Sequence, residues 1–459
     1  MQLNSILVKV SLFLLLLTSI TLNAQKKYSA GQLRADADFM INMMERTHIN
    51  LYEKFPKAEF YRQIENVKAS LKDSMTSLDL WKRIQPVIVM LGDGHTFSFM
   101  PQEERIEYLN KGGLVFPFTV KVDRDRIIVE QNFSGDPSIP PGSRILSING
   151  INAEGIISEM ARFESGEREL VRRNAVAYSF NIYLWAVFGW TDHFTMSYEK
   201  PDGQRINDKT FAGITRERYK EVSGTAKRGE AYSLKLIENE TVALIDFRSF
   251  SNMEKFSKFL KETFKTIKEK KINNLIIDVR NNPGGISILG DSLFSYITST
   301  PFVQFPRADV RLGDTIRKRY GDNFPNIHND TVLVFTAQPE KPQDKECKFH
   351  GKSYLLTSSF TFSSANVFAS TFKTYKIGSI IGEETGGLTV AYGDALSYTA
   401  PNTKMRFASS YKKFWEAGGR EDGHGVIPDY EVKQKIADTE KGVDTVFEFT
   451  LDLIRKDKR

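Results

Sequence analysis

The chain of 459 residues contains a single cysteine, Cys347. One cysteine cannot form an internal disulfide, so no disulfide framework holds this protein together. The sequence also has no cysteine at the end of its apolar N-terminal segment, where a lipid would be attached. A chain of this length is expected to fold around hydrophobic cores of its own, divided over two or three domains.

Long apolar runs are missing beyond the first 24 residues, and no later membrane span is predicted. The start of the chain differs, because Lys9 precedes the mostly apolar run 10–17 and Leu22-Asn23-Ala24 offers a small-residue cleavage site. These features predict a signal peptide over residues 1–24 rather than an uncleaved membrane anchor. Export of a protein without disulfides favours a periplasmic location, and secretion further out is the alternative.

A strong excess of one charge is lacking as well. Lysine and arginine number 63 and aspartate and glutamate 57, which gives a formal net charge of +6. The basic residues are scattered among acidic ones, so nucleic acid is not expected as a partner. The six histidines show no HExxH or similar ligand spacing, which argues against a metal site, and no other cofactor is expected.

Four parts of the chain differ in pattern. Residues 25–110 carry apolar positions at helical spacing, and residues 111–200 are rich in strand signals. Residues 201–232 are polar and poorly patterned, which indicates a linker. Strands and helices alternate over 233–459, as in an α/β core. Its predicted elements are strands at Val242–Phe247 and Ser379–Ile381, buried strands at Leu275–Val279, Val332–Phe335 and Tyr354–Leu356, and helices at Met253–Lys268 and Ser363–Tyr375.

Two adjacent serines stand where a predicted strand turns into a helix. Ser363 opens the helix, so its hydroxyl is exposed at the carboxyl end of the strand, as in a nucleophile elbow. The backbone N–H of Ser364 would lie where an oxyanion forms. The alternative is that Ser363 only caps the helix, for which serine is among the best residues.

Three further motifs have both a chemical and a purely structural interpretation. Gly284 and Gly285 follow a buried strand and form either an oxyanion hole or a tight turn. His95, within Gly92-Asp93-Gly94-His95, is either the base that a serine nucleophile needs or a turn residue. Glu421 and Asp422 either orient that base or belong to an exposed loop.

The order of these motifs resembles the C-terminal processing (tail-specific) serine peptidases. The matching segments are LIIDVRNNPGG, FSSANVFA, IIGEETGG and GVIPD, and the resemblance runs from about residue 30 to the end. It implies a crotonase/ClpP-like α/β catalytic core. The segment PPGSRILSING resembles the PDZ-like peptide-binding module of these proteins, which implies an inserted β-rich domain over 111–200.

The resemblance also implies roles for individual residues. Leu388 stands where one branch of the family has its catalytic lysine, and a leucine cannot act as a base. The other branch, similar to the tricorn core protease, uses serine, histidine and a carboxylate. On that alignment Ser363 is the nucleophile, His95 the base, and Asp422 or Glu421 the carboxylate. Oxyanion donors would come from Ser364 and from Gly284 or Gly285.

The expected function is that of an exported serine endopeptidase that cleaves proteins or peptides through an acyl-enzyme, with no stable membrane span after signal cleavage. Recognition of substrate C-termini by strand addition is one possibility for the PDZ-like module. Gly113 and Leu114 form either its carboxylate-binding loop or merely the entry to a strand, and Thr385 and Gly386 are the candidates for further substrate contacts. The alternatives are a catalytically silent peptide-binding protein and, against the predicted export, an enoyl-CoA-hydratase-like enzyme.

Overall fold

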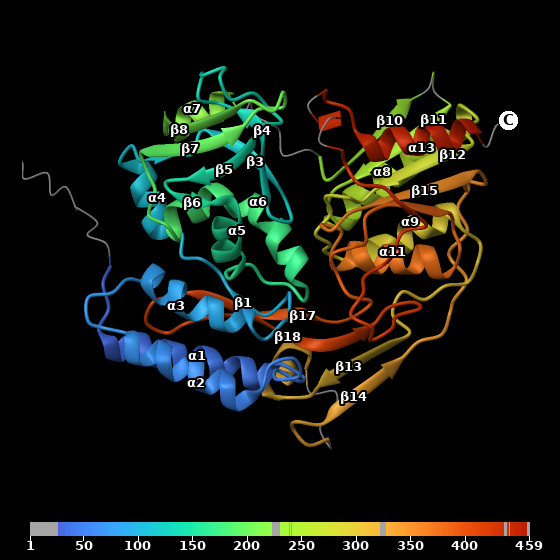
Figure 1. Cartoon of the computed structure of the whole chain (residues 1–459). Helices are drawn as coiled ribbons and strands as arrows, with labels where there is room; N and C mark the ends of the chain where they lie inside the picture. The colour runs from blue at the N-terminus through green and yellow to red at the C-terminus, as the bar shows by residue number, and fades with distance from the viewer. Residues whose placement is uncertain are drawn as a thin grey trace, which may run out of the picture.

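The computed structural model describes residues 26–222, 230–237, 239, 241–321, 327–435, 438–439 and 441–456. The predicted signal peptide lies outside these residues. Within them, no helix combines the length and the apolar character that crossing a membrane requires. Figure 1 shows three parts, namely N-terminal helices on a sheet at the bottom, a strand-rich part above them on the left, and an α/β part on the right.

The N-terminal part is helical, as the periodicity predicts. Ser29 and Gln32 form a capping box at the start of the first helix, which buries an apolar stripe including Leu33 and Met40. A short strand follows the third helix and precedes the fourth. The elements are α1 (Ala30–Thr47), α2 (Lys57–Ser70), α3 (Ser77–Val89), β1 (Phe97–Ser98) and α4 (Glu103–Asn110).

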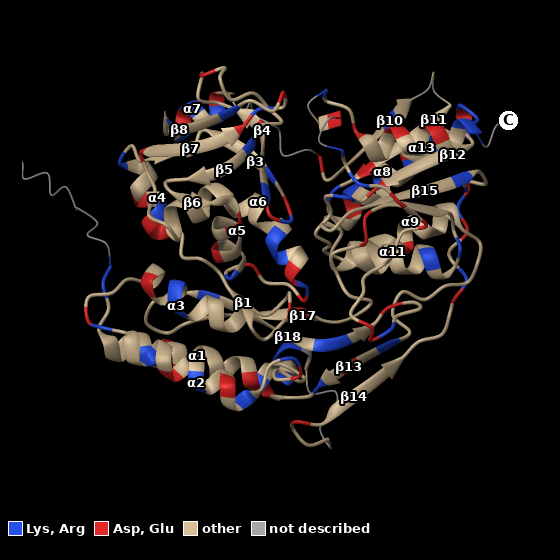
Figure 2. Cartoon of the chain, in the orientation of Figure 1, with Lys and Arg blue, Asp and Glu red and all other residues tan. Residues whose placement is uncertain are grey.

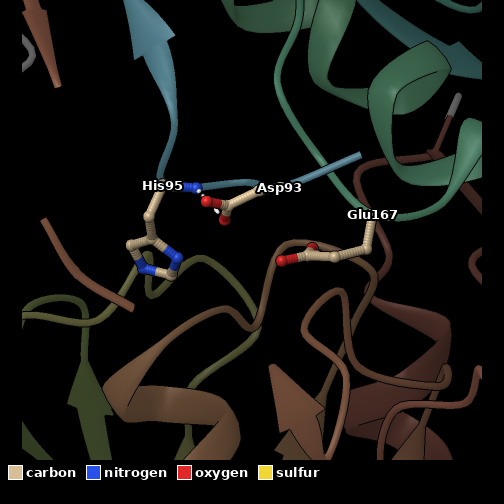
Figure 3. Close-up of side chains that lie close together, drawn as sticks. All are labelled: Asp93, His95 and Glu167. Carbon is tan, nitrogen blue, oxygen red and sulfur yellow. Dashed lines mark hydrogen bonds between the residues drawn. The ribbon is translucent and has the colours of Figure 1, made fainter. Parts of the chain in front are cut away.

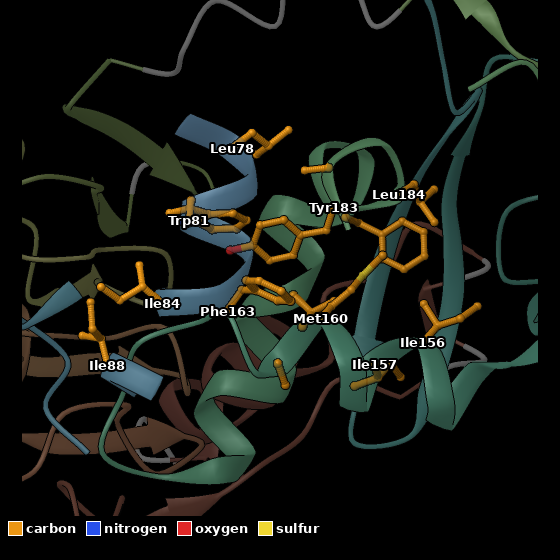
Figure 4. Close-up of a cluster of buried hydrophobic side chains, with 14 of the residues drawn as sticks. Leu78, Trp81, Ile84, Ile88, Ile156, Ile157, Met160, Phe163, Tyr183 and Leu184 are labelled. Atoms are coloured by element: carbon orange, nitrogen blue, oxygen red, sulfur yellow. The ribbon is translucent and has the colours of Figure 1, made fainter. Parts of the chain in front are cut away.

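The strand-rich part, which we call the insert, is built on one main sheet with helices packed beside it. Its main strands follow the order β3-β4-β5-β7-β8, and β6 pairs with β5. Figure 4 shows how α3 joins it, because Trp81 stacks on Phe163 at 4.8 Å and lies beside Tyr183. The elements are β2 (Leu114–Val115), β3 (Phe118–Asp123), β4 (Arg126–Asn132), β5 (Arg144–Ile148), β6 (Ile151–Asn152), α5 (Ala153–Ala161), α6 (Glu169–Ala186) and β7 (His193–Glu199).

The insert extends beyond residue 200. The polar stretch predicted to be a linker contains β8 (Arg205–Ala212), β9 (Ile214–Thr215) and α7 (Arg216–Val222). β8 pairs with β7 and β9 pairs with β2, so this stretch completes the sheet structure of the insert. The sequence of β8 shows no regular alternation of apolar and polar residues, because most of this strand is exposed and therefore polar on both faces.

The α/β core has the strand order β10-β11-β12-β15-β16-β19, with parallel pairing from β11 onward. Helices α8, α9 and α11 pack on one face, and α13 packs on the other. The elements are β10 (Tyr232–Ile237), β11 (Val242–Phe247), α8 (Met253–Glu269), β12 (Asn274–Asp278), α9 (Ile288–Ile297), β15 (Lys352–Thr357), α11 (Ser364–Thr374), β16 (Ser379–Gly382), β19 (Tyr430–Glu431) and α13 (Thr445–Lys456).

An arginine at the end of β12 ties α13 to the core. The guanidinium of Arg280 donates to both carboxylate oxygens of Asp444, at 2.8 and 2.7 Å, and to Asp278 at 2.9 Å. Asp444 directly precedes α13. The C-terminal helix is therefore held at the strand end that leads into the turn at Gly284.

A further sheet joins the N-terminal helices to the core. Its order is β1-β18-β13-β14, with β17 also pairing with β18. The prediction of a buried strand at Val332–Phe335 is wrong, because β14 is an outer strand with exposed side chains. The elements are β13 (Arg307–Arg311), α10 (Asp314–Tyr320), β14 (Val332–Thr336), β17 (Val390–Thr399) and β18 (Arg406–Trp415).

Candidate active site

Ser363 occupies a strained position between β15 and α11. Its backbone has φ +52° and ψ −126°, a conformation that residues other than glycine rarely adopt. It stands at the N-cap of α11, yet its side chain makes no capping hydrogen bond. The hydroxyl is therefore not used as a helix cap, and the strain marks a position held by its surroundings.

The imidazole of His95 meets this hydroxyl from a different part of the chain. His95 Nε2 lies 3.1 Å from Ser363 Oγ, within hydrogen-bond distance, although 268 residues separate the two. The ring stacks on Phe362 at a centroid distance of 5.0 Å. The two side chains thus converge where the loop after α3 meets the start of α11.

A buried carboxylate fixes the backbone of the His95 loop. Asp93 Oδ1 accepts a hydrogen bond from the backbone N–H of His95 at 2.9 Å. Burial acts to raise the pKa of Asp93, but the hydrogen bond from His48 and the nearby imidazoles hold this pKa well below its ordinary value. The contacts of Asp93 Oδ2 are His48 Nε2 (3.2 Å), Thr96 Oγ1 (2.5 Å) and Ser410 Oγ (2.6 Å).

A second carboxylate reaches the histidine from the insert. Glu167 precedes α6, and its Oε1 accepts a hydrogen bond from Gly94 N–H at 3.2 Å. Figure 3 shows its carboxylate directed toward the ring of His95. Glu167 Oε2 and His95 Nδ1 are both buried, and neither has a hydrogen-bond partner among the described residues. Burial and the nearby charge of Asp93 raise the pKa of Glu167.

The same three side chains form the cluster best suited to hold a metal ion within the described part of the chain. One donor atom each from Asp93, His95 and Glu167 lies within 4.8 Å of the others. The hydrogen bonds already made by both Asp93 oxygens account for its position without an ion. Nothing in the sequence pointed to Glu167, because it lies in a loop between two helices with no motif around it.

The carboxylates expected from the sequence lie elsewhere. Glu421 is exposed and pairs with Lys413 at 2.8 Å. Asp422 is also exposed, and its Oδ1 accepts the backbone N–H of His424 at 3.0 Å. Among the contacts of the described residues, neither carboxylate reaches His95. The expectation that one of them orients the imidazole is therefore not met by this structure, because both belong to a solvated loop.

The glycine turn lies against the serine pair. A Cβ on Gly284 would come within 2.7 Å of both Ser363 Cβ and the backbone nitrogen of Ser364. The N–H of Gly284 already donates to Asn282 Oδ1 at 2.9 Å. No hydrogen bond from the N–H of Gly285 or Ser364 is seen among the described residues. The hydroxyl of Ser364 donates to the carbonyl of Gly285 at 2.8 Å and thereby ties the turn to α11.

A buried network surrounds the first turn of α11. Asn366 donates to both carboxylate oxygens of Glu416 at 2.9 Å and to the carbonyl of Leu388 at 3.1 Å. Burial raises the pKa of Glu416 to about 8, and the charge of Glu167 adds to the rise. Leu388, which stands where one branch of the family has its catalytic lysine, takes part in this network through its backbone carbonyl.

Two of the four residues expected to contact substrate lie in the interior. Thr385 is fully buried, and its hydroxyl donates to Asn366 and accepts from the backbone N–H of Val426 at 2.7 Å. Gly386 packs against Ser359, whose carbonyl oxygen would lie 2.2 Å from an added Cβ. Their burial does not match the expected substrate contact.

The other two lie in the insert, next to its main cleft but not in its lining. Leu114 belongs to the β2–β9 pair, and Gly113 packs against Tyr108. The cleft itself has a volume of about 1050 Å³ and lies between the insert and the core. It is lined by residues of β3 and α6 on one side and by the Arg280–Asn281 and Thr357–Ser358 segments on the other.

Direct contacts fix the insert to the core beside Glu167. Arg168 forms an ion pair with Glu384 and donates to the carbonyl of Thr385. Asn174 Nδ2 donates to Ser359 Oγ at 3.2 Å. The residue that follows Glu167 therefore anchors this loop to the core, which holds the carboxylate of Glu167 near His95.

Comparisons with known proteins bear on the fold and on the family. A family model for peptidase family S41 matches residues 241–432. Mature CPAF has a similar structure, with 13% identity, a TM-score of 0.63 and coverage of 93% of this chain and 97% of that chain. The structure of mature CPAF complexed with lactacystin has 14% identity and a TM-score of 0.63, and the match covers 93% of this chain and 98% of that chain. The photosystem II D1 C-terminal processing protease has 12% identity and a TM-score of 0.45, and the match covers 87% of this chain and 93% of that chain. A search of curated proteins finds no match.

The mixed α/β fold and the family match define the class of protein as a serine peptidase. Residues 241–432 match peptidase family S41. This match implies protein or peptide substrates.

Proposed function

We propose that this protein is an exported serine endopeptidase in which Ser363 is the nucleophile and His95 the general base. The observation that carries the proposal is the 3.1 Å approach of His95 Nε2 to Ser363 Oγ. His95 takes the proton as Ser363 Oγ attacks the peptide carbonyl, and returns it to the leaving amine. Water then attacks the acyl-enzyme carbonyl while His95 takes its proton, and the second product leaves as Ser363 regains its hydrogen.

Glu167 is the carboxylate that we assign to His95 in place of Asp422 or Glu421. When Nε2 accepts the serine proton, Nδ1 must carry a hydrogen and needs an acceptor. Nδ1 and Glu167 Oε2 are both buried, have no hydrogen-bond partner within the described part of the chain, and belong to residues of one cluster. A small movement that brings them together satisfies both atoms, and such contacts are often long before substrate binds.

The oxyanion is stabilised by the backbone N–H groups of Gly285 and Ser364. Both are unengaged among the described residues, whereas the N–H of Gly284 is already used by Asn282. Gly284 instead provides the space that lets the turn lie against Ser363. Two donors near a helix N-terminus favour the negative charge of the tetrahedral intermediate.

The substrate is an extended polypeptide that enters through the cleft between the insert and the core. β3 is an outer strand of its sheet, and together with α6 it lines this cleft. A peptide added to the free edge of β3 uses backbone hydrogen bonds, as in strand addition. This arrangement supports a PDZ-like role for the insert in recognising substrate C-termini. Export is proposed from the N-terminal segment, where Lys9 precedes the apolar run 10–17.

A fluorophosphonate probe tests the nucleophile, since it labels only an activated serine. Wild-type protein is expected to label, and Ser363→Ala abolishes labelling. Ser292→Ala, which alters a half-buried serine on α9, is the matched control and labels like wild type. Absence of wild-type labelling, together with binding of peptides to the folded protein, would support the silent peptide-binding protein instead.

A further inference from the structure

The outer strand β14 presents an apolar surface with no described neighbour. Val332, Val334 and Phe335 are 45%, 55% and 46% exposed. The strand pairs with β13 on one side only, and Figure 1 places it at the outer edge of the molecule. Exposed apolar outer strands are prone to pair with another chain, because their backbone groups on one side are unpaired.

This strand lacks the features that normally protect a sheet edge. Residues 331–339 read TVLVFTAQP and contain no charge. Figure 2 shows β14 without a charged residue. Its pairing with β13 runs from Arg311↔Val332 to Arg307↔Thr336 without a register shift, so no bulge bends the strand away. Charges, bulges and prolines within the strand are the usual means of blocking edge pairing.

The free backbone groups of β14 can be identified from the pairs at its two ends. Ala337 N–H donates to the carbonyl of Pro306 at 3.1 Å, and Leu312 N–H donates to the carbonyl of Thr331 at 2.8 Å. Hydrogen-bonded pairs alternate along an antiparallel ladder, so residues 331, 333, 335 and 337 face β13. The N–H and C=O groups of Val332, Val334 and Thr336 therefore point outward.

From this geometry we propose that β14 pairs antiparallel with β14 of a second copy of this chain, about a two-fold axis at Val334. The three outward residues are then matched, with Val334 opposite Val334 and Val332 opposite Thr336. A two-fold interface requires a surface that complements itself, and this edge does. The result joins the two β13–β14 sheets into one continuous sheet.

Side chains also match across the proposed axis. The β-branched residues Val332, Val334 and Thr336 share one face of β14. On the other face Leu333 lies opposite Phe335 of the partner, and the pair occurs twice. Aliphatic and aromatic cross-strand pairs stabilise antiparallel sheets, and like charges directly opposite each other destabilise them. An uncharged strand of this composition therefore favours a second copy over a charged partner.

Sedimentation velocity tests the proposal. Because the contact is small, wild-type protein is expected to pass from monomer to dimer with a Kd in the micromolar range. Val334→Lys places two ammonium groups opposite each other and is expected to weaken dimerisation at least about tenfold. Ile151→Lys, an equivalent change on the exposed strand β6, leaves dimerisation unchanged. A wild type that stays monomeric at about 100 μM overturns the proposal.

Cross-linking tests the register separately, in a Cys347→Ser background. Val334→Cys places two cysteines about 5.5 Å apart between Cα atoms, within disulfide range. Val332→Cys places its two copies about 13 Å apart, too far to bridge. The proposed register requires that oxidation links the first variant and not the second. Equal cross-linking of both variants, or pairing of the edge with an added peptide in a monomer, overturns it.

Discussion

Substituting Gly284 by alanine probes the contact between the glycine turn and the nucleophile. Gly284 has φ +99°, a conformation that strains any L side chain. The new Cβ would also lie 2.7 Å from Ser363 Cβ, 2.7 Å from Ser364 N and 2.8 Å from the carbonyl oxygen of Phe362. All three atoms belong to the strained segment that presents the hydroxyl, so this segment or the turn must move.

The expected loss follows from what these atoms do. A displacement that removes one oxyanion donor costs about 10²–10³ in rate, or about 2.7–4 kcal/mol of transition-state stabilisation. Backbone strain adds about 1–3 kcal/mol to the cost of folding. The second-order rate of fluorophosphonate labelling measures the first effect, and the thermal midpoint measures the second. We therefore expect labelling to slow about 10²–10³-fold while the protein remains folded at 25 °C.

Gly135→Ala separates the two effects. Gly135 has φ +78°, yet an added Cβ meets no atom within 4 Å. This variant carries the strain without the collision and is expected to label at the wild-type rate. The loss of one oxyanion donor should slow labelling far more than about threefold. If the labelling rates of Gly284→Ala and Gly135→Ala differ by less than about threefold, the turn does not support the nucleophile and our assignment of the oxyanion site is wrong.

Three further predictions concern charged groups. Glu167→Gln is expected to lower kcat about 10²–10⁴-fold with little change in KM, and Glu421→Gln to leave both unchanged; peptide hydrolysis against pH decides between these carboxylates. The pKa of Glu416 is about 8 in the folded protein against 4.5 ordinarily, so its contribution to stability is full below pH 4.5 and is lost as pH rises through 8. The thermal midpoint should therefore fall over this interval, and less steeply in Glu416→Gln. Arg280→Met leaves Asp444 without its ion-pair partner and is expected to cost about 1–2 kcal/mol, between an exposed and a buried pair, because Asp444 is 40% exposed. Hydrogen exchange in α13 should become faster, and unchanged exchange would contradict the tether.

Much of the fold could be predicted from the sequence, because the strands and helices of the core have regular apolar patterns. Val242–Phe247 and the α8 segment were predicted almost to the residue, since one is apolar except for Asp246 and the other has a clear helical stripe. Apolar content alone misled at β14, where an equally apolar strand lies at an exposed edge. A buried strand and an exposed pairing edge have the same composition, and only the position in the sheet distinguishes them.

Both residues of the proposed catalytic pair could also be predicted from the sequence. Ser363 and His95 lie in glycine-rich or turn motifs whose order along the chain is informative. The carboxylate was not accessible, because Glu167 reaches the site through the packing of an inserted domain. Glu421 and Asp422 were preferred for their place in a motif, and a motif does not reveal the direction of a side chain.

The proposed catalytic group is assembled from three separate regions: the loop after α3, the insert and the start of α11. Neither His95 nor Glu167 has a local reason to be near Ser363, since 268 residues separate the histidine from the serine. A chain still in synthesis, or held unfolded, would therefore contain an ordinary unreactive serine. Under the proposed mechanism the serine gains its base only when these regions fold together, so proteolytic activity depends on the completed tertiary structure.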